Sequence, residues 1–178
     1  MNYHFDYMLE TWFPKDDKRH KGLKHPVMGL CSEIGELIGE LDKQEFKPGY
    51  DQNLYSLINK ELGDVWYYIR AMAYCLDCEL GDYQKEDTDS INGCLSLMIA
   101  DAGNLFVLID SEDYELDEFA LKLAHMDLLN VFAVFLNLLG HFNIDLDWLS
   151  EDNYNKLVDK QSGKGKHGWD TELDNKAD

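Results

Sequence analysis

The chain has 178 residues, of which 35 are Asp or Glu and 16 are Lys or Arg, so its formal net charge is -19. This length fits one domain with a continuous core. The negative charge argues against nonspecific nucleic-acid binding, because displacing counterions from phosphates requires a basic surface. No apolar stretch is long enough to span a membrane, since the nearest, Met126–Gly140, is broken by Asp127, Asn130 and Asn137. The N-terminus has no charged-then-apolar signal pattern. We therefore expect a cytoplasmic protein with neither nucleic acid nor membrane as a partner.

Apolar residues recur at intervals of three and four, and the three prolines lie in the first third of the chain, which predicts an all-α fold. In chain order we expect helices at about 2–12, 27–44, 53–80, 91–110, 115–140 and 147–160. Gly81 and Gly140 are the expected ends of the third and fifth of these. We expect one domain over residues 1–160, followed by a Gly- and Lys-rich tail, 161–178, that closes over a substrate.

Two pairs of acidic residues carry the functional prediction, Glu33 with Glu36 and Glu61 with Asp64. Residues three apart share a helix face, so each pair projects from one side of its helix. The short connection between the two helices predicts antiparallel packing, with the pairs facing each other. Four converging carboxylates repel one another, and a hard dication such as Mg²⁺ or Mn²⁺ removes the repulsion. The sequence therefore predicts a metal site between two helices.

A single E-x-x-E on a helix is most often only a solvated face. These two pairs differ from that pattern because apolar residues border both of them. Each pair also encloses a glycine, Gly35 or Gly63. Glycine within a helix costs about 1 kcal/mol relative to alanine, but it leaves room for a bound phosphate or a closely packed helix. We therefore prefer the metal site to the solvated face.

Three segments resemble a known family. Gly29–Leu37 (GLCSEIGEL) and Glu61–Tyr68 (ELGDVWYY) resemble the E-x-x-E…E-x-x-D motif of the MazG-like all-α nucleoside triphosphate pyrophosphohydrolases. Asn153–Lys160 (NYNKLVDK) is similar to that family's N-x-x-K-L-x-x-R segment, although Lys160 stands where the family usually has Arg. The resemblance covers about 25–80 and 145–168, and it implies a helical bundle whose metal-binding helices form an antiparallel pair.

The resemblance implies hydrolysis of a nucleoside triphosphate to the monophosphate and pyrophosphate, with Mg²⁺ or Mn²⁺ as cofactor. It implies that the metal ligands are Glu33, Glu36, Glu61 and Asp64. One of the first pair would also orient the attacking water, and we prefer Glu36 to Glu33 for this role. The candidate phosphate contacts are Lys60, Asn153, Lys156, Lys160, Lys164 and Lys166. It further implies a homo-oligomer, either a dimer or a tetramer, in the host cytoplasm if a phage encodes the chain.

Several alternatives remain open at this stage. The same chemistry fits a narrow specificity for dUTP, dCTP or dGTP, and the base-binding residues stay unknown. Asn104 and Asn130 are candidate base contacts only if the second half repeats the first, and the aromatic run Trp66–Tyr68 is more typical of a core than of base stacking. A non-catalytic helical module that binds a nucleotide or a partner is the alternative from another class. Ala100–Leu105 and Asp127–Leu129 are similar in pattern to Ser32–Leu37 and Asp64–Trp66. Residues 82–144 are therefore either a degenerate second helix pair or an unrelated insertion.

Overall fold

The computed structural model describes residues 23–46, 54–81, 90–111 and 116–161. These residues form helices and their connections without a strand, which confirms the all-α prediction. The helices are α2 (Lys24–Phe46), α3 (Leu54–Cys75), α4 (Ile91–Ser111), α5 (Glu118–Phe142) and α6 (Leu146–Gln161). The helix expected at 2–12 and the tail after residue 161 lie outside the described residues.

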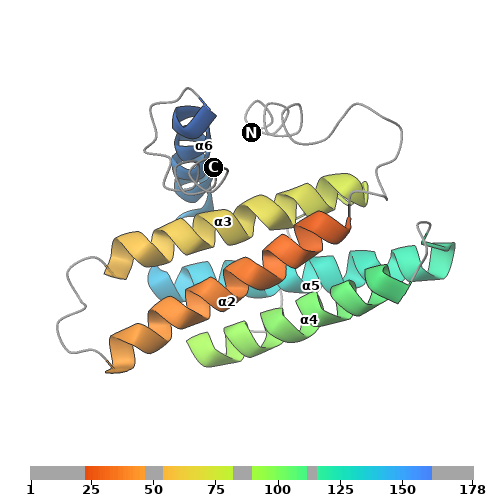
Figure 1. Cartoon of the computed structure of the whole chain (residues 1–178), viewed down its shortest axis with the longest axis horizontal. Coiled ribbons are helices and arrows are strands. Elements are labelled where there is room, and N and C mark those ends of the chain that lie inside the picture. Colours follow the sequence, from red (N-terminus) through yellow and green to blue (C-terminus); the bar gives the residue numbers. More distant parts are fainter. Residues whose placement is uncertain (1–22, 47–53, 82–89, 112–115, 162–178) are drawn as a thin grey trace, which may run out of the picture.

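Two antiparallel helix pairs make up most of the structure, α2 with α3 and α4 with α5 (Figure 1). The pairs pack on each other mainly through α2 and α4, with a smaller contact between α3 and α5. The last helix, α6, lies across α3 at a steep angle (Figure 1). The second helix pair is thus a partner for the first within one chain, and α6 covers the side of α3 that faces away from α4.

The core lies between the two pairs and follows the helical repeat. In the first half of α5 the buried positions recur every four residues, as expected for one apolar face: Ala120, Ala124 and Leu128. Further along, α5 is buried on most sides, since Val131, Phe132, Ala133, Val134 and Phe135 are all buried. Trp66 of α3 packs against this part of α5, because its indole stacks on the rings of Phe132 and Phe135 at centroid distances of 5.7 and 5.9 Å. These contacts fix α3 against α5.

Two helix ends differ from the sequence prediction. Helix α3 ends at Cys75 rather than near Gly81, and α5 ends at Phe142 rather than at Gly140. In both cases a residue other than glycine takes the left-handed conformation that closes a helix, Asp77 and Asn143, each with φ of 54°. Asp and Asn tolerate this conformation better than most residues, so the nearby glycines are not needed as caps.

Two helices are long and apolar enough to cross a membrane by length and composition, over Ile91–Ile109 and Glu118–Phe142. By length and composition, the expectation that no stretch is long enough is therefore wrong, because a few polar residues barely change the average over about twenty positions. The finding is weak evidence for a membrane protein, since the core helix of a soluble bundle has the same features. Helix α5 carries the stacked Phe132 and Phe135 of the core.

Candidate metal site

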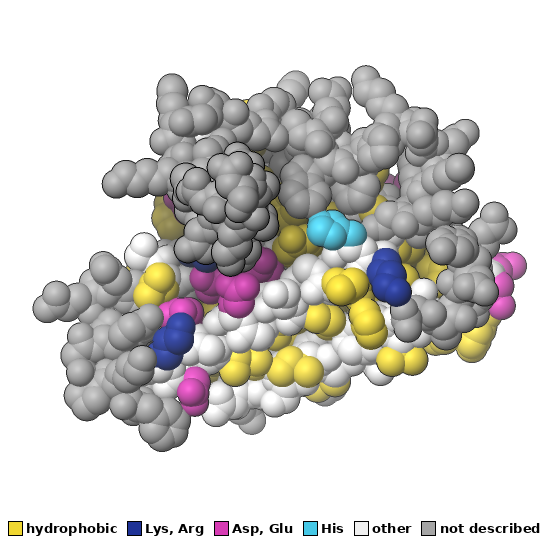
Figure 2. Space-filling model, in the orientation of Figure 1, with side chains coloured by type: hydrophobic (Ala, Val, Ile, Leu, Met, Phe, Trp, Pro, Cys, Tyr) yellow, Lys and Arg dark blue, Asp and Glu magenta, His cyan; other side chains and the backbone are white. Residues whose placement is uncertain are grey.

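The first helix pair brings three of the four predicted carboxylates together. Glu33 on α2 and Glu61 and Asp64 on α3 each offer one oxygen, and these atoms all lie within 4.8 Å of one another. Glu61 is buried, with 4% of its surface exposed, whereas Glu33 and Asp64 are partly exposed. Figure 2 shows Asp and Glu side chains gathered in one patch on the face where α2 and α3 meet. We call Glu33, Glu61 and Asp64 the acidic cluster.

The two carboxylate oxygens of Glu61 differ in their hydrogen bonding. Its Oε1 accepts a hydrogen bond from Lys60 Nζ at 2.6 Å. Its Oε2 is buried and has no hydrogen-bond partner among the described residues. A buried carboxylate oxygen without a partner is unfavourable unless a cation or another donor satisfies it. The oxygen-only donor set of the cluster fits the hard cations Mg²⁺ and Mn²⁺.

Mutual repulsion within the cluster is most evident at Glu33. The pKa of Glu33 is raised from its ordinary value of 4.5 to about 7, and burial is the largest cause. The negative charges of Asp64, Glu36 and Glu61 contribute to this rise, and Lys60 acts in the opposite direction. Near neutral pH, Glu33 is therefore protonated in part of the metal-free molecules, because burial and the neighbouring carboxylates disfavour its charged form.

The pKa of Glu33 predicts how the metal-free protein depends on pH. Between pH 4.5 and about 7 the folded state keeps a proton on Glu33 that the unfolded state has released. Raising the pH through this window therefore favours the unfolded state, and the free energy of unfolding falls. We expect the free energy of unfolding of Glu33→Gln to fall less than that of the wild type between pH 4.5 and about 7. Urea denaturation in the presence of EDTA measures both. Equal declines in the two proteins would contradict this assignment.

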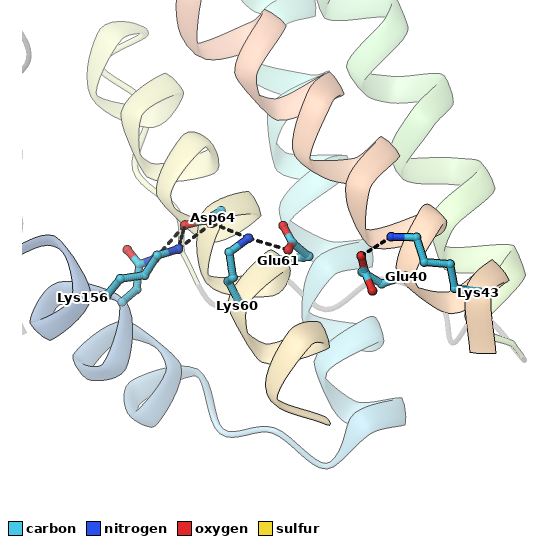
Figure 3. A network of polar contacts seen from close by, with 7 residues as sticks. Glu40, Lys43, Lys60, Glu61, Asp64 and Lys156 are labelled. Atoms are coloured by element: carbon cyan, nitrogen blue, oxygen red, sulfur yellow. Dashed lines mark hydrogen bonds and ion pairs between the residues drawn. The ribbon is translucent and has the colours of Figure 1, made fainter. Parts of the chain in front are cut away.

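Helix α6 brings a positive charge to the cluster (Figure 3). Lys156 Nζ donates to both oxygens of Asp64, at 2.5 Å to Oδ1 and 2.6 Å to Oδ2. Asn153 Nδ2 lies 3.4 Å from the same Oδ1. Lys60 completes the arrangement, because its Nζ is 3.9 Å from Asp64 Oδ2 as well as bonded to Glu61. Two lysines thus offset part of the cluster's negative charge.

Contacts between α3 and α6 place Lys156 at the cluster. Trp66 Nε1 donates to Ser150 Oγ at 2.8 Å, which joins the middle of α3 to the first half of α6. One turn earlier on α3, a Cβ added to Gly63 would lie 3.0 Å from Asn153 Nδ2. Gly63 therefore permits a closely packed neighbouring helix, which was one of the two explanations offered by the sequence.

The remaining predicted site residues are placed differently. Glu36 is exposed and lies outside the acidic cluster, although its charge raises the pKa of Glu33. Gly35 is also exposed, and nothing lies within 4 Å of the position of a Cβ there. Lys160 is in α6, but its side chain is outside the described residues, as are Lys164 and Lys166. Their expected roles stay predictions.

Tyr68 lies near the acidic cluster. The sequence alone did not distinguish it from its aromatic neighbours Trp66 and Tyr67. Trp66 and Tyr67 are buried, whereas Tyr68 is partly exposed. Burial raises the pKa of Tyr68, and the charges of Glu33, Asp64 and Glu36 raise it further. The Tyr68 ring also lies against the backbone of α2, where a Cβ on Gly29 would come within 2.2 Å of Tyr68 Cε1.

The approach of Tyr68 to Gly29 gives a prediction for stability. Gly29→Ala places a methyl group inside the Tyr68 ring, so we expect it to lower the free energy of unfolding by about 1–3 kcal/mol. The matched control is Gly35→Ala in the same helix, which should raise stability by about 0.5–1 kcal/mol. In a Tyr68→Ala background this loss should disappear, and Gly29→Ala should then resemble Gly35→Ala. Urea denaturation of the four variants measures this, and an unchanged effect in that background would contradict the contact.

The second helix pair retains part of the acidic pattern. Asp101 lies on α4 and Asp127 on α5, and both are partly buried. Burial raises the pKa of Asp127, and the charge of Asp101 raises it further, so the two carboxylates are near each other. Asn104 is exposed. This pair lies outside the acidic cluster of α2 and α3, and its origin as a degenerate repeat stays a prediction.

No protein-family model matches this sequence, and no curated protein or solved structure is significantly similar to it. The fold and the site nevertheless define a class. The chain is an all-α helical protein with a carboxylate cluster, on two antiparallel helices, that could hold a metal ion. Its membership of the MazG-like family stays a prediction based on the motif resemblance.

Proposed function

We propose that this protein hydrolyses a nucleoside triphosphate to the monophosphate and pyrophosphate, using Mg²⁺ or Mn²⁺ held by Glu33, Glu61 and Asp64. The observation that carries the proposal is the buried Oε2 of Glu61, which has no hydrogen-bond partner in the described part of the chain and lies beside two further carboxylates. A protein gains nothing in stability from such a cluster alone, because its members repel one another. A cation that binds together with the substrate would offset this repulsion, which accounts for three carboxylates lying together.

The side chains around the cluster support a phosphate substrate. A bound dication offsets the charge of the phosphates and lowers the pKa of its water. Lys60 and Lys156 already lie at the carboxylates, so they are close to where a metal-bound triphosphate would sit. Partial burial lowers the pKa of Lys60, but its hydrogen bond to Glu61 and the surrounding carboxylates outweigh burial and raise the pKa overall. Lys60 is therefore a permanent cation at physiological pH.

The roles of the individual residues follow from their positions. Glu33 belongs to the acidic cluster, so it would hold the metal ion and could orient the attacking water beside it. Glu36 is exposed one turn further along α2 and keeps the alternative role of orienting that water. Tyr68 offers a partly exposed ring beside the carboxylates, which suits contact with the sugar or base. The preferred nucleotide, including dUTP, dCTP or dGTP, is left to experiment.

The direct test is incubation with a panel of NTPs and dNTPs in Mg²⁺ or Mn²⁺, with the products separated by ion-exchange chromatography. We expect a nucleoside monophosphate and pyrophosphate in equal amounts, and no product in EDTA. Orthophosphate as the first product would place the cleavage at another phosphate and refute the proposal. Binding of a nucleotide without turnover of any member of the panel would support the non-catalytic module instead.

A further inference from the structure

Asp64 is the most heavily contacted carboxylate of the acidic cluster. Both of its oxygens accept from Lys156 Nζ, and Asn153 and Lys60 lie at longer distances from them. Glu61 differs, because its Oε2 remains without a partner among the described residues. Glu61 therefore has an oxygen that could accept a cation, whereas Lys156 already engages both oxygens of Asp64 (Figure 3).

A dication and Lys156 compete for Asp64. Mg²⁺ binds carboxylate oxygens at about 2.0–2.1 Å, and at that distance it would face the ammonium group that now bonds to both Asp64 oxygens. Like charges so close repel strongly in a partly buried site. Lys156 must therefore move away from Asp64 when the cation binds there, or the cation must bind without Asp64.

Lys156 and Lys60 differ in the carboxylate that each of them engages. Lys156 reaches Asp64 from a different helix and carries its ammonium group on a flexible four-carbon stem. A small rotation about that stem releases Asp64 without changing the backbone. Lys60 bonds instead to Glu61 at 2.6 Å, next to it in sequence, and is only a distant neighbour of Asp64. Lys60 can keep its place when Asp64 takes a metal ion.

We propose that Lys156 is an exchangeable cation that holds Asp64 in the metal-free protein and passes to the substrate's triphosphate when a metal ion takes Asp64. This inference rests on the proposed function. The exchange makes metal and triphosphate bind cooperatively, because each favours the state in which Lys156 has left Asp64. By reciprocity, the triphosphate strengthens metal binding by the same factor as the metal strengthens triphosphate binding. Lys156 thereby disfavours metal loading without substrate.

The test uses Lys156→Met and two probes, Mn²⁺ alone and inorganic tripolyphosphate. We expect Lys156→Met to bind Mn²⁺ alone about tenfold more tightly than the wild type, because the competing hydrogen bonds to Asp64 are gone. The same variant should bind tripolyphosphate at least about tenfold more weakly in excess Mn²⁺. Mn²⁺ binding is measured by electron paramagnetic resonance and tripolyphosphate binding by isothermal titration calorimetry. The two affinities thus change in opposite directions.

Lys122→Met is the matched control, since it removes one positive charge from an exposed i,i+4 pair with Glu118 on α5. It should change neither affinity. Lys156→Gln repeats the test with a polar side chain, and circular dichroism checks that each variant is folded. Mn²⁺ affinity that is unchanged or lower in both Lys156 variants overturns the exchange while leaving the metal site standing. No Mn²⁺ binding by the wild type or by any variant overturns the proposed function as well.

Discussion

Replacing Glu61 by Gln should abolish Mg²⁺-dependent hydrolysis and leave the metal-free protein at least as stable as the wild type. Glu61 is the buried member of the acidic cluster, and its Oε2 has no partner among the described residues. The amide keeps the shape of the side chain but removes a negative charge from between Glu33 and Asp64. We expect the turnover rate to fall at least about 100-fold, because loss of a metal ligand exceeds the effect of losing a supporting residue.

The matched control for this prediction is Glu40→Gln on α2. Glu40 also pairs with a lysine, Lys43, at 2.6 Å, but it lies outside the cluster. This variant should retain turnover close to that of the wild type. Pyrophosphate release in Mg²⁺ and thermal unfolding in EDTA are measured for the wild type, Glu61→Gln and Glu40→Gln. A Glu61→Gln protein that is fully active, or one that is much less stable than the wild type without metal, would contradict a metal-binding role.

Replacing Trp66 by Ala should produce the largest loss of stability. The indole stacks on Phe132 and Phe135 in the core and donates to Ser150 on α6. Removing it leaves a cavity between α3 and α5, and such substitutions cost about 3–5 kcal/mol. We also expect looser attachment of α6, because Ser150 loses its donor. Urea denaturation in EDTA measures the loss in free energy of unfolding.

Trp66→Phe separates the two contributions of this side chain. Phenylalanine keeps a ring between Phe132 and Phe135 but cannot donate to Ser150. We expect a smaller loss, of which the hydrogen bond accounts for about 1 kcal/mol. If Trp66→Ala lowers stability by less than about 1 kcal/mol, the stacked cluster does not hold α3 against α5 and the described core is wrong at this point.

Much of the candidate site follows from local spacing in the sequence. Glu33, Glu61 and Asp64 converge as predicted, because α2 and α3 pack antiparallel. Residues three apart on an α-helix diverge by about 60° around the axis, so they do not point the same way. On α3 both members of the pair still reach the cluster, whereas on α2 only Glu33 does. When Glu33 points at α3, Glu36 points partly to solvent, and it is the exposed member of its pair.

Contacts between distant parts of the chain could not be predicted in the same way. Lys156 and Asp64 are 92 positions apart, and their contact depends on the angle at which α6 crosses α3. The sequence marked Lys156 as a phosphate contact without placing it on a carboxylate. The aromatic run from Trp66 to Tyr68 shows the same limit, because rotation of about 100° per residue sends one ring into the core and another towards the acids.

The most direct test of the central claim is a crystal structure of the protein grown with Mn²⁺ and measured near the manganese absorption edge. The account predicts an anomalous scattering peak within coordination distance of carboxylate oxygens from Glu33, Glu61 and Asp64. It also predicts that Lys156 Nζ has left Asp64 in that crystal. Full Mn²⁺ occupancy elsewhere in the molecule, with the Lys156–Asp64 pair intact and no peak at the acidic cluster, would contradict the account.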